Sequence, residues 1–238
     1  MNDKHPNTVS ISVFFPCYNE QGNVKRTVEN ALTVLEKIGA DYEVIIVNDG
    51  SSDATGSIAE KIVSKNPRVK VVHHPTNLGY GSALQSGFKA STKELVFFTD
   101  GDGQFDMYEM PPLLPLTDQY DIVTCYRINR QDTLIRKINA WCWTKLVCVL
   151  FNMKIRDIDC AFKLFKRGSV DTAKLVSTGA LIDAEILARA TRKGCKITQV
   201  GVHHYPRTAG AQTGAKLSVI FRAFRELFKL SNQIKSGN

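Results

Sequence analysis

The stretch FFTDGDGQFD, residues 97–106, decides how this chain can be interpreted. Apolar residues run directly into Asp100 and Asp102, each followed by glycine, and a third acid stands at Asp106. Like charges this close repel one another and raise each other's pKa unless a cation lies between them. The stretch therefore predicts a buried strand that ends at a cation site.

Three known uses of such a carboxylate run compete, beside a plain acidic turn that caps the strand. An EF-hand calcium loop needs Gly at its sixth position and an acid at its twelfth. Counted from Asp100, these positions hold Phe105 and Pro111, so this use fails. A haloacid-dehalogenase-type phosphatase has a similar Asp-x-Asp-Gly run, but early in its fold. Nucleotide-sugar glycosyltransferases use an Asp-x-Asp pair to hold a divalent ion on the donor diphosphate.

The first half of the chain alternates between expected strands and helices, which disfavours the phosphatase because so much structure precedes Asp100. The expected strands are 10–16, 42–48, 69–74, 94–100 and 120–126, and the expected helices are 21–38, 52–65 and 80–91. This alternation predicts right-handed βαβ units and a mostly parallel sheet flanked by helices. Ligands bind beyond the carboxyl ends of such strands, which is where the chain places its polar motifs.

The second half has a different pattern and a different charge. Residues 134–152 are predicted to form an unusually apolar helix, 157–165 a turn into a strand, and 182–194 a helix followed by a strand. An apolar stripe at helical spacing marks a last helix over 217–228. Residues 1–124 carry a net charge of −6 and residues 125–238 one of +14. This asymmetry predicts an acidic half for a metal and a basic half for an anionic partner, with nucleic acid and an anionic membrane surface as candidates.

Composition limits the class of protein. A chain of 238 residues with 43% hydrophobic residues suits one α/β domain. No apolar run approaches the roughly 20 residues of a membrane span, and the N-terminus lacks the apolar core of a signal peptide. The six cysteines are scattered without a Cys-x-x-Cys pair, which favours reduced thiols. We therefore expect a cytoplasmic protein.

Several motifs together resemble a known family. FFPCYNEQGNV, VNDGSSDAT, NLGYGSALQSGF and FTDGDGQFD resemble, in sequence and order, the motifs of GT-A family 2 glycosyltransferases. DIDCAFKLF and HHYPRTAGAQTGAK resemble the later motifs of the polyprenyl-phosphate branch, the dolichol-phosphate mannose synthase-like enzymes. The resemblance spans residues 11 to about 230. It implies a single GT-A (Rossmann-like) α/β domain over 1–238, with a nucleotide-sugar-binding half (1–124) and an acceptor half (125–238) whose helical C-terminal portion faces a membrane. The alternative is that the apolar stripes of this portion pack on the domain core or on another subunit.

The resemblance also implies a reaction. We expect inverting, metal-dependent transfer of a hexose from a UDP- or GDP-sugar to polyprenyl (undecaprenyl or dolichyl) phosphate. A saccharide or another soluble acceptor is the alternative. The partner of the basic half would then be this lipid phosphate and the cytoplasmic face of a membrane, bound peripherally, and no nucleic acid. The oligomeric state stays open, a homo-oligomer included. A non-catalytic nucleotide-sugar-binding protein would be expected to have a damaged carboxylate pair, whereas both carboxylates are present.

The family motifs imply roles for individual residues. Asp100 and Asp102 are expected to hold Mg²⁺ or Mn²⁺, and to be catalytic together with Arg127 and Arg207, which we expect to position the acceptor phosphate. The expected nucleotide-sugar-binding residues are Pro16, Tyr18, Glu20, Asp49, Gly79, Asp100, Gly101, Asp102, Gln104 and Lys216. Asp157 and Asp159 are expected to orient the basic groups or a sugar hydroxyl. The chain has Asp-Gly-Asp where the family usually has Asp-Ala-Asp, and a longer Gly-rich loop before Lys216.

Overall fold

The computed structural model describes residues 8–129, 134–207, 209 and 226–234. The strands are β1 (Ser10–Cys17), β2 (Asp41–Asn48), β3 (Val69–His73), β4 (Leu95–Thr99), β5 (Ile122–Ile128), β6 (Phe162–Lys166) and β7 (Ile197–His203). The helices are α1 (Val24–Lys37), α2 (Thr55–Val63), α3 (Tyr80–Ala90), α4 (Leu134–Phe151) and α5 (Ile182–Arg192), followed by a helical segment at 226–234.

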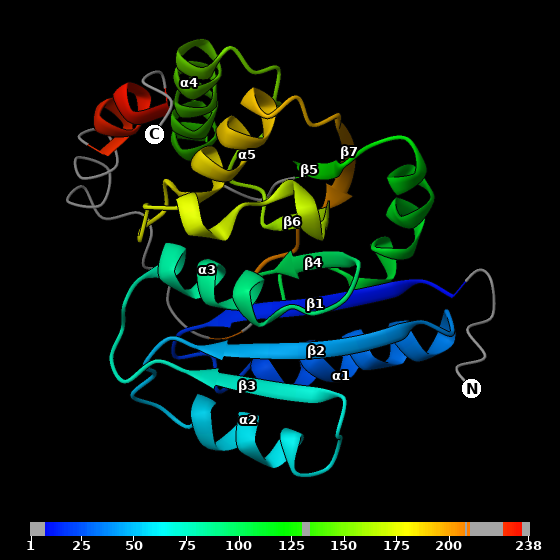
Figure 1. The fold of residues 1–238 in the computed structure, drawn as a ribbon. Helices are drawn as coiled ribbons and strands as arrows, with labels where there is room; N and C mark the ends of the chain where they lie inside the picture. Colours follow the sequence, from blue (N-terminus) through cyan, green and yellow to red (C-terminus); the bar gives the residue numbers. More distant parts are fainter. Residues whose placement is uncertain (1–7, 130–133, 208, 210–225, 235–238) are drawn as a thin grey trace.

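The strands form one mixed sheet in the order β3-β2-β1-β4-β6-β5-β7 (Figure 1). β1 pairs in parallel with β2 and β4, β2 with β3, and β5 with β7. β6 is antiparallel to both β4 and β5. The expected α/β fold with a mostly parallel sheet is therefore confirmed. The sheet differs from a simple βαβ series in that β6 lies between β4 and β5.

Helices cover both faces of this sheet, as expected for parallel strands. Along β1, Phe14 belongs to the core that includes side chains of α3, α4 and α5, whereas Phe15 belongs to the opposite core with α1 and α2. Successive side chains of a strand point to opposite faces, so one buried strand supplies both cores. Figure 1 shows α3 in front of the central strands and α1 behind them.

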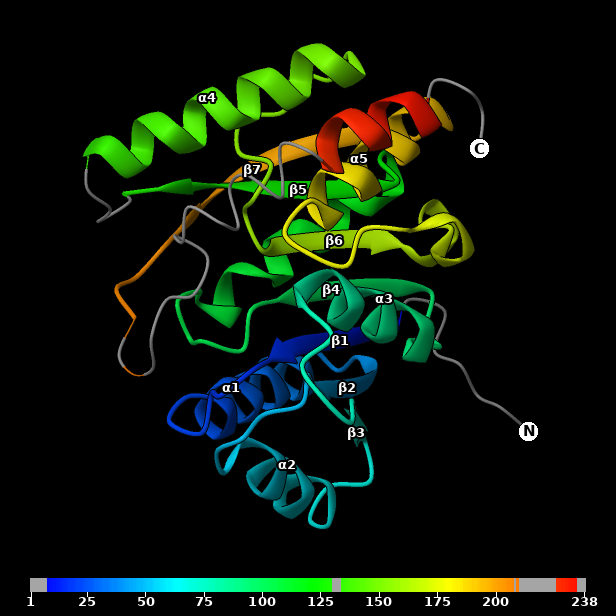
Figure 2. The ribbon, with the colours of Figure 1, turned by 90° about the vertical axis from the view of Figure 1, so that its left-hand side faces the viewer.

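The helical segment 226–234 packs on the protein itself. It lies beside α5 on the α3–α5 side of the sheet (Figure 2), where Leu227, Leu230 and Ile234 are buried in the core. Leu227 was expected on a stripe that faces a membrane or, alternatively, packs on the core or another subunit. Its exposed fraction of 0% supports packing on the core, although Phe228 is exposed. Burial against the core removes the apolar surface that a membrane would otherwise cover. Residues 217–224 of the expected stripe lie outside the described residues.

α4 is the apolar helix expected from the sequence, and it is buried on one side only. Val147 and Cys148 enter the core, whereas Trp141 is 60% and Val149 80% exposed. Leu134 and Ile138 lie on the same exposed face. Across the described ranges, no helix has both the length and the apolar character needed to cross a membrane.

Candidate active site

The polar motifs of the first half converge at one edge of the sheet because their strands are parallel. Residues 18–20 follow β1, Asp49 follows β2 and Asp100 follows β4. The backbone N–H of Gly101 donates to the carbonyl of Pro16 over 3.3 Å, and that of Asp49 donates to the carbonyl of Cys17 over 2.9 Å. These bonds bring the ends of β1, β2 and β4 together, and Tyr18 stays partly exposed beside them.

Asp100 lies in surroundings that disfavour its charge. Burial raises the pKa of Asp100 to about 8, and the negative charges of Asp102 and Asp183 add to this shift. The Tyr80 hydroxyl hydrogen-bonds to Asp100 and opposes it. One carboxylate oxygen, Oδ1, is buried and accepts no hydrogen bond. A buried oxygen without a partner is costly unless a cation or water satisfies it.

Asp102 is buried and belongs to a small ionic group. Its Oδ1 accepts the backbone N–H of Gln104 over 3.0 Å, and its Oδ2 accepts Nη2 of Arg207 over 3.0 Å. The same Nη2 lies 3.0 Å from Oε1 of Glu20. Arg207, which we expected at the acceptor phosphate, therefore contacts the carboxylates at the ends of β1 and β4.

The carboxylate pair fits a divalent cation. Asp100 and Asp102 supply hard oxygen ligands, and the partnerless Oδ1 of Asp100 is available to one. Within the described ranges, no group of three or more His, Cys, Asp or Glu side chains could hold a metal. The protein thus offers two carboxylates, which suits an ion that completes its shell with substrate oxygens, as Mg²⁺ usually does.

Asp49 fixes a loop with both of its oxygens. Its carboxylate accepts the backbone N–H groups of Leu78 and Gly79 over 2.9 and 3.0 Å, and it lies 2.7 Å from Nδ1 of His74. Gly79 has φ +98°, and a Cβ there would lie 2.5 Å from the carbonyl oxygen of Thr178. Glycine is required for this turn. Asp49 and Gly79 therefore shape the rim of the site at the start of α3.

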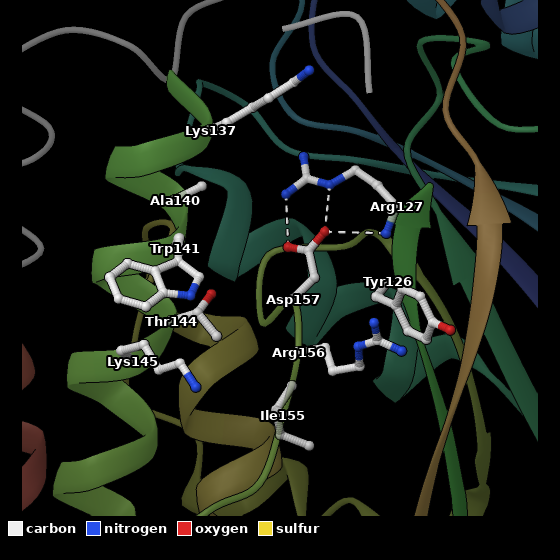
Figure 3. Close-up of a pocket in the computed structure, with 10 residues that line it drawn as sticks. All are labelled: Tyr126, Arg127, Lys137, Ala140, Trp141, Thr144, Lys145, Ile155, Arg156 and Asp157. Atoms are coloured by element: carbon white, nitrogen blue, oxygen red, sulfur yellow. Dashed lines mark hydrogen bonds and ion pairs between the residues drawn. The ribbon is translucent and has the colours of Figure 1, made fainter. Parts of the chain in front are cut away.

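A pocket of about 420 Å³ lies between β5, α4 and the loop before β6 (Figure 3). Its floor contains a two-pronged ion pair, in which Nε and Nη2 of Arg127 donate to Asp157 over 2.7 and 2.8 Å. Burial opposes the charge of Arg127, but Asp157 raises its pKa above the usual value. The remaining lining residues are Tyr126, Lys137, Ala140, Trp141, Thr144, Lys145, Ile155 and Arg156.

The rim of this pocket is cationic and aromatic. The Arg156 guanidinium stacks over the Tyr126 ring at 3.9 Å, and Nζ of Lys145 lies 5.9 Å from the centre of the Trp141 ring. Figure 3 shows Lys137, Trp141 and Lys145 projecting from α4 on one side, with Arg156 on the other. A set of cations around an open cavity attracts an anion.

A buried ionic cluster connects the pocket with the carboxylate pair. Nζ of Lys163 donates to Oδ1 of Asp183 and to the carbonyls of Ile158 and Cys160. Burial raises the pKa of Asp159 to about 6, with further contributions from the charges of Asp183 and Asp157. The charge of Asp183 also contributes to the raised pKa of Asp100.

Sequence reasoning located some of these residues and missed others. The structure brings Pro16, Tyr18, Glu20, Gly101 and Gln104 to the edge with the carboxylate pair, and it places Arg127 with Asp157 in the pocket. Lys216 lies outside the described residues. Lys163, Asp183, Tyr80 and Arg156 were missed. Lys163, which lies between Phe162 and Leu164 inside strand β6, was the one signal that could have indicated the buried cluster.

The fold is an α/β sheet of the kind in which ligands bind beyond the carboxyl ends of parallel strands, and the polar motifs of this chain converge there. The family model for glycosyl transferase family 2 matches residues 12–173. The chain therefore belongs to glycosyl transferase family 2 and is a glycosyltransferase.

Solved structures of glucosyl-3-phosphoglycerate synthase from Mycobacterium tuberculosis are similar to this chain. The complex with Mn²⁺, UDP and glucosyl-3-phosphoglycerate matches with a TM-score of 0.69 at 19% identity, over 93% of this chain and 78% of the other. The complex with Mg²⁺ and UDP matches with a TM-score of 0.71 at 18% identity, over 94% and 80%. A complex with Mn²⁺, UDP-glucose and phosphoglyceric acid has a TM-score of 0.68 at 18% identity, over 93% and 78%. Similarity at this level of identity concerns the fold.

Proposed function

We propose that this glycosyltransferase moves a hexose from a UDP- or GDP-sugar to an acceptor that carries a phosphate group, with inversion at the sugar. The observation that carries the proposal is the cationic pocket around Arg127 and Arg156, in a protein that also has a buried carboxylate pair at the end of β4. The pair suits a donor diphosphate with its metal, and the pocket suits a second anion. Positive charge is needed to bring two anions within reach of each other.

The residues have separate tasks in this mechanism. Asp100 and Asp102 would hold Mg²⁺ or Mn²⁺, which supplies charge neutralisation for the donor diphosphate when bound. Arg127, fixed by Asp157, and Arg156 would hold the acceptor phosphate. An oxygen of the acceptor attacks the anomeric carbon while the bond to the nucleoside diphosphate breaks, and in polyprenyl phosphate that oxygen belongs to the phosphate. A phosphate oxygen is already anionic near neutral pH, so no strong general base is required.

The similar structures favour a small, soluble acceptor. Their ligands are UDP, UDP-glucose, phosphoglyceric acid and glucosyl-3-phosphoglycerate, with Mn²⁺ or Mg²⁺. Phosphoglyceric acid carries a phosphate, which matches the charge of the pocket described here. These structures share the fold at 18–20% identity, and the cationic pocket supports an acceptor with a phosphate group.

Polyprenyl phosphate is the second candidate acceptor, and one observation favours it. The exposed apolar face of α4, with Leu134, Ile138, Trp141 and Val149, continues from the rim of the pocket through Trp141. An acceptor whose phosphate lay in the pocket could rest its apolar chain, or the lipid surface around it, on this face. Trp residues favour the interface between lipid and water. The protein would then bind peripherally to the cytoplasmic face of a membrane.

The test is a transfer assay with purified protein and UDP- or GDP-hexoses. The acceptors are phosphoglycerate, a short-chain polyprenyl phosphate in vesicles, and an unphosphorylated saccharide. We expect product only with a phosphorylated acceptor. Arg156→Ala should raise KM for that acceptor roughly tenfold, about 1.4 kcal/mol, and leave KM for the donor unchanged. The matched control is Arg192→Ala, which removes an exposed arginine at the end of α5.

A substitution on α4 distinguishes polyprenyl phosphate from phosphoglycerate as the acceptor, and another result would contradict the proposal. Val149→Ser, on the exposed face of α4 outside the pocket, should weaken transfer to vesicle-bound polyprenyl phosphate if the lipid rests on α4, and it should leave transfer to phosphoglycerate unchanged. Efficient transfer to the unphosphorylated saccharide, with neither phosphorylated acceptor used, would show that the pocket does not hold an acceptor phosphate.

A further inference from the structure

Arg207 forms ion pairs with a carboxylate beyond the end of β1 and with one beyond the end of β4. Its Nη2 lies 3.0 Å from Oε1 of Glu20 and 3.0 Å from Oδ2 of Asp102. Both carboxylates are buried, and the arginine side chain is 17% exposed. One guanidinium group therefore neutralises two buried carboxylates, one of which belongs to the metal-binding pair.

The segment that carries Arg207 is held at the site by independent contacts. The backbone N–H of Tyr205 donates to the carbonyl of Gln104 over 2.9 Å, and Nε2 of Gln104 donates to the carbonyl of Tyr205 over 2.8 Å. Gln104 also donates its backbone N–H to Asp102. Nδ2 of Asn23 donates to the carbonyl of Ala209 and to Oε2 of Glu20. The chain after β7 is thus anchored to both motifs, which brings the guanidinium to the carboxylates.

The charges of this group depend on one another. Burial raises the pKa of Glu20, and the hydrogen bond from Asn23 and the charge of Arg207 oppose that rise. Burial opposes the charge of Arg207, but the charges of Asp102 and Glu20 raise its pKa. A divalent cation on Asp102 would share one carboxylate group with this guanidinium. Like charges this close repel strongly in a buried site. Binding of a metal ion to Asp102 would therefore weaken the ion pair between Oδ2 of Asp102 and Arg207, and the ion pair would weaken metal binding.

We propose that Arg207 is an internal counter-ion that competes with the divalent cation for Asp102. This inference rests on the proposed function, because it takes Asp100 and Asp102 as the metal ligands. Without donor, the guanidinium holds Asp102 and Glu20, and the ion binds weakly. When the donor binds, its diphosphate gives the guanidinium another anionic partner. Asp102 is then released from the ion pair and becomes available to bind the metal ion. Arg207 thereby makes metal binding depend on the donor, as a positioning residue on the donor side of the site.

The experiment measures Mn²⁺ affinity by isothermal titration, with and without UDP or GDP, in four proteins. These are the wild type, Arg207→Ala, Arg207→Lys and the control Lys166→Ala, which removes a partly exposed cation paired with Asp121. We expect Arg207→Ala to bind Mn²⁺ alone roughly tenfold more tightly than the wild type, a coupling in the usual range. The gain in Mn²⁺ affinity caused by the nucleotide should shrink by a similar factor. Arg207→Lys should restore weak binding, and Lys166→Ala should match the wild type.

Different results of this experiment would contradict the competition by Arg207 and the proposed function. Unchanged or weaker Mn²⁺ binding in Arg207→Ala, with a normal thermal unfolding curve and normal Mn²⁺-dependent nucleotide binding, would overturn the competition alone. If Arg207→Ala is poorly folded, Arg207→Gln provides the same test with a neutral hydrogen-bond donor. Absence of Mn²⁺ binding in every protein, with or without nucleotide, would overturn the metal site and with it both proposals.

Discussion

At the scale of single residues, Glu43 shows how a buried charge is stabilised when its partners are complete. Its Oε1 accepts the Ser12 hydroxyl over 2.7 Å and the backbone N–H of Thr92 over 2.6 Å, and its Oε2 accepts Nζ of Lys70 over 2.6 Å. Burial alone would raise the pKa of Glu43, but these donors lower it to about 2. The residue joins β1, β2, β3 and the segment before β4 on the end of the sheet away from the active site.

This lowered pKa predicts a pH dependence of stability. Because the folded pKa lies below the unfolded one, the contribution of Glu43 is complete above about pH 5 and is lost as pH falls toward 2. Glu43→Gln should lower the free energy of unfolding at pH 7 by about 1–3 kcal/mol, since donors to a buried charge lose their partner. Urea unfolding at pH 7 and at pH 3 measures this. The difference between wild type and variant should be smaller at pH 3, and an equal difference at both would contradict the assignment.

Some residues of the candidate site could be predicted from the sequence, and others could not. Asp100 and Asp102 were predicted because two acids at the end of an apolar strand are a local pattern. The contact of Arg207 with Asp102 and Glu20 could not be predicted, because it depends on where the chain passes after β7. The same applies to Asp49, whose oxygens are used by the loop before α3. A motif identifies chemistry, whereas the pairing of distant side chains depends on the tertiary fold.

At the level of secondary-structure elements, the sequence predicted the positions of strands and helices well, but it did not predict that β6 lies between β4 and β5 in the sheet. Hydrophobic periodicity is local, and it located β1 to β5 and α1 to α3 close to their observed bounds. The place of β6 between β4 and β5 has no local signal, because strand partners are chosen over long distances in the chain. The connection from β4 to β5 consists of short 3₁₀ helices in place of a long crossover helix.

The packing of α3 on β1 provides an element-scale prediction. A Cβ on Gly87 would lie 2.3 Å from the Phe14 ring, whose neighbours Phe88 and Phe98 are within 5.1 and 5.4 Å between ring centres. Gly87→Ala should therefore lower the free energy of unfolding by about 1–3 kcal/mol, although alanine favours helix. The control is Gly168→Ala, where a Cβ meets nothing within 4 Å. Thermal unfolding compares the two, and equal melting temperatures would contradict the close packing.

At the scale of the whole molecule, the charge asymmetry of the sequence has a structural counterpart. The acidic first half supplies Glu20, Asp100 and Asp102 at one edge of the sheet, and the basic second half supplies Arg127 and Arg156 in the pocket. Arg207 is the exception, since a residue of the basic half lies among the carboxylates. Of the two segments expected to face a membrane, α4 has an exposed apolar face, whereas the helix at 226–234 buries Leu227, Leu230 and Ile234 in the core and exposes Phe228.

The central claim is that the carboxylate pair after β4 holds the donor nucleotide through a divalent ion. The most direct measurement is titration of UDP and GDP with Mn²⁺ or with EDTA into the wild type, Asp102→Asn and Asp106→Asn. Asp106 is the matched control, because it belongs to the same acidic stretch but caps a 3₁₀ helix through the backbone N–H of Tyr108. We predict tight nucleotide binding with Mn²⁺ in the wild type and Asp106→Asn. EDTA or Asp102→Asn should weaken this binding by roughly tenfold or more, at least about 1.4 kcal/mol. Nucleotide binding that is equally tight in EDTA and in Asp102→Asn would contradict the account.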